Sequence, residues 1–77
     1  MNRKLKLIWD FKGSFSAKTA EHHCIHLKEF AIIEKLHFYE INSLVISKMH
    51  TTAFIIVDES DMKIYRDALK PHRGQLA

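Results

Sequence analysis

A chain of 77 residues with two glycines, one proline and one cysteine is long enough for one domain and too short for two. Hydrophobic residues make up 47% and charged residues 27%, which is the balance of a folded globular domain and excludes an intrinsically disordered chain. The formal net charge is +3, and lysine and arginine gather toward both ends of the chain while the middle is acidic. A fold that brings the two ends together creates either a basic patch for an anionic partner or simply a solubilising surface.

The first strand and the first helix are clear in the sequence. Residues 4–12 alternate between apolar and polar side chains, which predicts a strand buried on one face. Gly13 ends this strand, and Ser14 or Ser16 offers the N-cap of a helix that extends to about Leu36. The helix side predicted to pack on the sheet carries Ala17, Ala20, Cys24, Leu27, Phe30 and Ala31. Apolar residues away from this stripe indicate that something covers the C-terminal half of the helix: Ile25, Ile32, Ile33 and Leu36.

The second half of the chain predicts two strands and a shorter helix. Residues 38–47 favour a strand, with Asn42 and Ser43 as a bulge or turn in its middle. Residues 51–57 predict a strand with apolar side chains on both faces. The acidic segment 58–61 supplies the cap and first turn of a helix that ends before Pro71, and the residues beyond it suffice only for a short strand.

The order βαββα with a short tail resembles the ferredoxin-like plait, βαββαβ, with its last strand short or absent. The resemblance covers essentially the whole chain and rests on the pattern of elements. It implies an α+β domain spanning residues 1–77, with an antiparallel sheet and two helices on one face. This plait carries many unrelated functions, so the resemblance predicts an architecture and no activity.

A chain of this length can bury only a small core, so the fold needs a further source of stability. Domains of this length usually rely on disulfides, a metal or a partner subunit, and the single Cys24 excludes an intramolecular disulfide. We therefore expect self-association or a metal. The longest apolar run, residues 53–57, is far too short to cross a membrane, and a lone thiol suits a reducing cytosol. A cytoplasmic protein without a membrane segment is the resulting expectation.

Six histidines make the chain histidine-rich, and three of them lie within residues 22–26. His22 and His26 are four residues apart and share a helical face, and Glu29 continues that face. Two imidazoles and a carboxylate can hold zinc or copper, so these three residues form a candidate metal site. The alternative is a polar face or a subunit contact. His23, at the edge of the buried stripe, is expected to be a hydrogen-bonded structural residue.

Other chemistry is poorly represented in the sequence. Cys24 lies on the stripe that packs on the sheet, and Gly13 and Gly74 do not form a phosphate-binding loop. Residues 50–57 share only Phe54 with the aromatic set of an RNA recognition motif, which argues against sequence-specific binding of nucleic acid. No acid–base pair identifies a reaction.

The function that the sequence favours is a small homodimeric binding or interaction module, with an unidentified small molecule or protein as ligand. Its interface is predicted at the apolar centre of the sheet face without helices, through Ile8, Ile46 and either Phe54 or Ile55, or by pairing of edge strands. One alternative is a zinc- or copper-binding protein that uses His22, His26 and Glu29. The enzymatic alternative is a dimeric α+β barrel of the oxygenase type.

Overall fold

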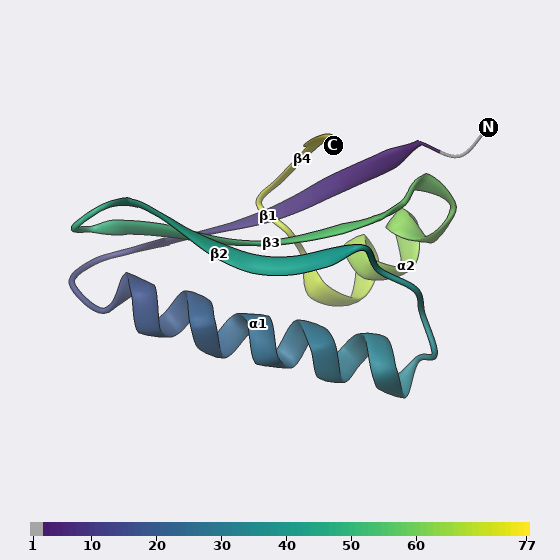
Figure 1. Cartoon of the computed structure of the whole chain (residues 1–77), viewed down its shortest axis with the longest axis horizontal. Coiled ribbons are helices and arrows are strands. Elements are labelled where there is room, and N and C mark those ends of the chain that lie inside the picture. The colour runs from purple at the N-terminus through teal and green to yellow at the C-terminus, as the bar shows by residue number, and fades with distance from the viewer. Residues whose placement is uncertain (1–2) are drawn as a thin grey trace.

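The computed structural model describes residues 3–77, which form one four-stranded sheet and two helices (Figure 1). In chain order the elements are β1 (Lys4–Lys12), α1 (Ser16–Ile33), β2 (Glu40–Ser47), β3 (His50–Asp58), α2 (Glu59–Leu69) and β4 (Arg73–Leu76). The chain therefore has the α+β class that the sequence predicts, and its last strand is short. No helix within residues 3–77 is long and apolar enough to span a membrane.

The strands lie in the order β2-β3-β1-β4, and every neighbouring pair is antiparallel. Leu7 in β1 pairs with Ile55 in β3, and on its other side β1 pairs with β4, where Leu5 lies opposite Leu76. The first and last strands are thus neighbours. As a result the two basic ends of the chain meet at one edge of the sheet.

Both helices cover the same face of the sheet (Figure 1), and the core lies between them and the strands. The alternation of β1 places Leu7 and Trp9 on this face, while Ile8 points to the other. Alternation in β3 places Ile55 and Val57 toward the helices in the same way. The buried cluster consists of Leu7, Trp9, Leu27, Ala31, Ile55, Val57 and Tyr65.

The N-terminal end of α1 differs from the expectation of a serine cap. Phe15 occupies the N-cap position and makes no side-chain cap hydrogen bond. Ser16 is buried instead, and its hydroxyl lies 3.1 Å from the hydroxyl of Thr51 in β3. Gly13 has a φ of 112° and donates its N–H to the carbonyl of Met49 at 2.7 Å, so the turn is fixed by the β2–β3 connection. The predicted serine cap is therefore wrong because Ser16 joins the helix to the sheet.

The C-terminal end of α1 falls at Ile33, three residues before the predicted end. Lys35 has a left-handed φ of 55°, and Leu36 donates its N–H to the carbonyl of Ala31 at 2.9 Å, which is the Schellman arrangement. Leu36 then packs against the core. The expected cover over the rest of the helix is absent from residues 3–77, since Ile25, Ile32 and Ile33 are 55–73% exposed. Ala17, predicted on the buried stripe, is also exposed.

Two details of the second half also differ from the prediction. The second strand begins at Glu40, and its irregularity lies between Val45 and Ser47, while residues 42–43 pair regularly with β3. Asp58 occupies the N-cap of α2 without a side-chain cap bond, because its carboxylate accepts a hydrogen bond from the Tyr39 hydroxyl at 2.7 Å. The helix ends at Leu69, where a left-handed Lys70 precedes Pro71.

Candidate functional site

The free edge strand β2 carries a run of exposed apolar side chains. Leu44, Val45 and Ile46 are 52–62% exposed, and Met49 in the following turn is 56% exposed. Strand order leaves one side of β2 without a neighbour. Ile46, one of the predicted interface residues, therefore lies on an accessible edge.

The backbone of β2 also offers unused hydrogen-bonding groups along this edge. The N–H of Ser43 bonds to its neighbour's side chain, Asn42 Oδ1, at 2.8 Å, so it points away from β3. The carbonyl of Leu44 accepts a bond from Thr52 Oγ1 on β3 at 3.4 Å and points inward. Because a strand repeats every two residues, the backbone groups of Ile41 and Val45 point outward with those of Ser43.

Ile8 and Phe54, the other predicted interface residues, are paired in the register on the face without helices. They are only 4% and 8% exposed. The Lys6 ammonium lies 4.2 Å from the centre of the Phe54 ring, and the Lys4 ammonium covers Tyr39 at 4.3 Å in the same way. The apolar centre of this face is therefore covered within one copy. Ile55, the alternative to Phe54, faces the helices and is fully buried.

The structure brings His22 and His26 together on the exposed surface of α1. Their Nε2 atoms lie 2.9 Å apart, and the Nδ1 atom of His26 lies 3.2 Å from a carboxylate oxygen of Glu29. Glu29 thus contacts the ring nitrogen of His26 that points away from His22. This places Glu29 where a carboxylate orients a metal-binding histidine, and not where a third ligand would be. Within residues 3–77, no three His, Cys, Asp or Glu side chains are grouped to hold a metal ion.

His23 packs against the sheet as the sequence predicts, but within the described chain the expected hydrogen bond is missing at its buried Nε2 atom. Its ring packs against Trp9 and Phe11, with ring centres 4.8 and 5.4 Å away. Its Nε2 atom is buried and has no hydrogen-bond partner among residues 3–77. Burial, followed by the charges of His26 and His72, lowers the pKa of His23. Burial likewise raises the pKa of the Cys24 thiol, which disfavours its reactive thiolate form.

Asp10 links three strands on the face without helices. Its carboxylate accepts two hydrogen bonds from Arg73 of β4, at 3.0 and 3.1 Å, and lies 2.9 Å from His50 Nε2 of β3. Its backbone N–H donates to His72 Nδ1 at 2.8 Å. The bonds from Arg73 and His50 lower the pKa of Asp10 to about 2. This cluster attaches the short β4 to the sheet, and no motif in the sequence indicates it.

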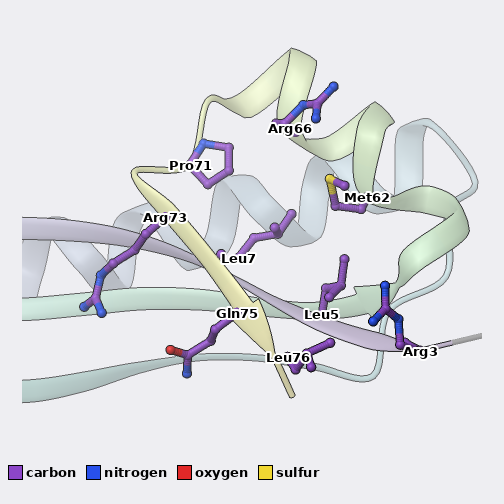
Figure 2. A pocket seen from close by; sticks show the side chains of 10 residues that line it. Arg3, Leu5, Leu7, Met62, Arg66, Pro71, Arg73, Gln75 and Leu76 are labelled. Atoms are coloured by element: carbon purple, nitrogen blue, oxygen red, sulfur yellow. The ribbon is translucent and has the colours of Figure 1, made fainter.

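A cavity of about 560 Å³ lies between α2 and the β1–β4 edge, opposite the β2 edge in strand order (Figure 2). Its apolar lining comes from Leu5, Leu7, Met62, Pro71 and Leu76. Arg3, Arg66 and Arg73 also line it, and no Asp or Glu of the described chain does. The basic character of the two chain ends was the one sequence signal that could have located this site.

The functional assignment rests on these geometries and on the sequence. Comparison with protein-family models, with curated proteins and with solved structures gives no match for this chain.

Proposed function

We propose that the chain is a small homodimeric binding module with the ferredoxin-like plait, and that two copies pair through their β2 edges. The order βαββαβ supports the plait, as does the antiparallel strand order β4-β1-β3-β2 when the sheet is read from its other edge. The location of both helices on one face gives further support (Figure 1).

The exposed apolar edge of β2 is the main observation that supports a dimer. Unpaired edge strands are usually protected by lysine, proline or inward-pointing charges. Strand β2 contains no lysine or proline, and its one charged residue is Glu40 at its start. Its consecutive exposed Leu44, Val45 and Ile46 make it a surface that another strand would stabilise.

The sequence of β2 is compatible with pairing to itself. An antiparallel pair centred on Ser43 places the outward backbone groups of Val45 opposite those of Ile41 in the other copy. The same contacts form twice around a two-fold axis, as an isologous interface requires. No like charges face each other in this register, because Glu40 lies opposite Ile46. The Asn42 side chain, which now holds the Ser43 N–H, would be displaced by the incoming strand.

The flank of α1 beside β2 adds apolar area to the strand pair. His23 marks the α1 flank that faces β1, and at 100° per residue Ile25 and Ile32 lie on the opposite side of the helix, away from β1. These two side chains are 55% and 72% exposed. A stable dimer buries about 1,200–2,000 Å² in total, which is more than one strand pair supplies. We therefore expect α1 of each copy to take part in the interface.

The test is the solution mass of the intact chain and of edge variants. Light scattering should give twice the 9.1 kDa chain mass at micromolar concentration. Val45→Lys should shift the mass to that of the monomer, because it places a charge on the paired edge. The control is Ile64→Lys, at an exposed aliphatic residue on α2 that is 45% exposed, and this variant should remain dimeric. Circular dichroism confirms that each variant folds, and a wild-type mass that stays at one chain on concentration contradicts the proposal.

The oxygenase-type alternative requires the sheet faces of two copies to pack together into a barrel. Ile8 and Phe54 at the centre of that face have little surface left to bury. Edge pairing is therefore the better supported assembly.

A metal-binding function is the second candidate, and the convergence of His22 and His26 favours it. Both Nε2 atoms reach one exposed position on α1, while Glu29 lies against the other nitrogen of His26. Two imidazoles leave two positions of a tetrahedral zinc site for water or for a second copy. The site would weaken in acid, because only neutral imidazoles coordinate.

Calorimetry with zinc tests this candidate. Replacing both His22 and His26 by alanine should abolish binding without unfolding the chain, since both side chains are exposed. Glu29→Gln should weaken binding by about tenfold, the usual effect of losing a carboxylate that orients a histidine ligand. His37→Ala is the control for an exposed histidine elsewhere. If the double variant binds zinc with the affinity of the wild type, His22 and His26 are part of a polar surface and not metal ligands.

A further inference from the structure

The cavity between α2 and β4 combines an apolar interior with a cationic rim. Figure 2 shows Leu5, Leu7 and Met62 between the α2 and β4 ribbons, with Arg66 above them on α2. We propose that this cavity binds a medium-chain carboxylate, its hydrocarbon against the leucines and methionine and its head group at Arg66. The proposal does not depend on the dimer, because the cavity lies at the edge opposite β2.

The charges around the cavity favour an anion. Three arginines line it, and no carboxylate of residues 3–77 does. Arg73 is held by two hydrogen bonds to Asp10, and Figure 2 shows its side chain pointing away from the other lining residues. Arg3 is bonded to Glu59. These two arginines therefore contribute positive potential more than direct contacts.

Arg66 is the arginine best placed to bind a ligand. Its Nε atom contacts the neighbouring Asp67 at 3.2 Å, and both side chains are more than half exposed. Exposed pairs of this kind contribute little to stability, so a ligand carboxylate can replace Asp67 at small cost. The planar guanidinium then offers two parallel N–H donors to the two carboxylate oxygens.

The size and the apolar lining of the cavity indicate the class of ligand, as the arginines indicate its charge. A volume of about 560 Å³ suits a small ligand, and five of the lining side chains are Leu, Met or Pro. No aromatic side chain of the described residues lines the cavity, so it offers no surface on which a nucleotide base could stack. A flexible hydrocarbon chain with one anionic group fits these features better than a nucleotide.

The experiment is calorimetric titration of the full chain with decanoate, decanol, decyltrimethylammonium and decyl phosphate. Decanoate should bind, and decanol and the ammonium compound should bind at least tenfold more weakly. Equal binding of decanol would overturn the role of the anion. Tighter binding of decyl phosphate than of decanoate would overturn the assignment of a carboxylate.

Variants locate the site within the chain. Arg66→Ala should weaken decanoate binding by about tenfold, which is the usual loss for one charge-assisted contact, and Arg66→Lys should restore part of it. Lys63→Ala, a charge removal on the same helix outside the cavity, should leave the affinity unchanged. Leu76→Ser, at a 62% exposed position, should weaken binding without unfolding the chain.

The outcomes separate this proposal from the dimer. Val45→Lys should bind decanoate as the wild type does, whatever its oligomeric state. Unchanged affinity in both Arg66→Ala and Leu76→Ser would place the ligand elsewhere and refute the site.

Discussion

Replacement of Asp10 by asparagine tests whether one carboxylate holds β4 on the sheet. In the folded chain the bonds from Arg73 and His50 lower the pKa of Asp10 from 3.8 to about 2. At 1.36 kcal/mol per pH unit, this difference corresponds to at most ~2.4 kcal/mol of stability. The side chains of Asp10 and Arg73 are 22% and 52% exposed, so solvent screening reduces the figure to about 1 kcal/mol.

The pH range of the effect follows from the direction of the shift. A carboxyl group whose pKa is lower in the folded state stabilises the fold fully above the unfolded pKa of 3.8. That stability is lost as the pH falls from there toward 2. Asp10→Asn should therefore be about 1 kcal/mol less stable than the wild type at pH 6, and the difference should shrink below pH 4.

Urea denaturation at several pH values measures this difference, and amide hydrogen exchange shows where it acts. Exchange in β4 should accelerate in Asp10→Asn more than exchange in β3. Ser14→Ala, at an exposed position outside the cluster, is the control and should not change the pH profile. Parallel profiles for wild type and Asp10→Asn between pH 2 and 6 would refute the reasoning.

Three further predictions concern other parts of the fold. Burial keeps the pKa of His23 below its ordinary 6.5, so the stability of the fold should fall as the pH drops below 6.5. The urea midpoint of His23→Leu should depend less on pH than that of the wild type. Tyr65 is fully buried, and its hydroxyl donates to the His37 carbonyl at 3.3 Å. Thermal unfolding should show that Tyr65→Phe lowers the free energy of unfolding by about 1 kcal/mol and Tyr65→Ala by about 3–5 kcal/mol. Gel-shift titration should find only weak, salt-sensitive RNA binding, and submicromolar binding of one defined strand that Phe54→Ala abolishes would contradict this.

The elements whose pattern is local were predictable from the sequence. The alternation of residues 4–12 gives the bounds of β1 as the structure has them, and the four-residue spacing of His22 and His26 correctly places their rings side by side. The α1 end was misplaced because Lys35 adopts a left-handed conformation, which a sequence signals by glycine or asparagine at that position and not by lysine.

The remaining differences come from side-chain contacts that no local sequence pattern shows. Ile8 and Phe54 were expected to form an exposed patch, and no local pattern indicates that Lys6 lies over the Phe54 ring. Glu29 shares the helical face of the histidine pair, yet which nitrogen it meets depends on side-chain conformation. The cavity draws on residues from both ends of the chain, so its lining could be assembled only once β1 and β4 were known to be neighbours.

The C-terminal ends of both helices contain a lysine in a left-handed conformation, which lowers the stability of this small fold. Lys35 and Lys70 have φ values of 55° and 50°, a conformation that costs a residue with a Cβ atom about 1 kcal/mol and glycine almost nothing. Both side chains are exposed, so glycine at either position would remove no packing. Lys35 follows the C-terminal end of α1 and Lys70 that of α2. A chain with glycine at both positions should therefore unfold at higher temperature and would offer a more stable background for the variants described above.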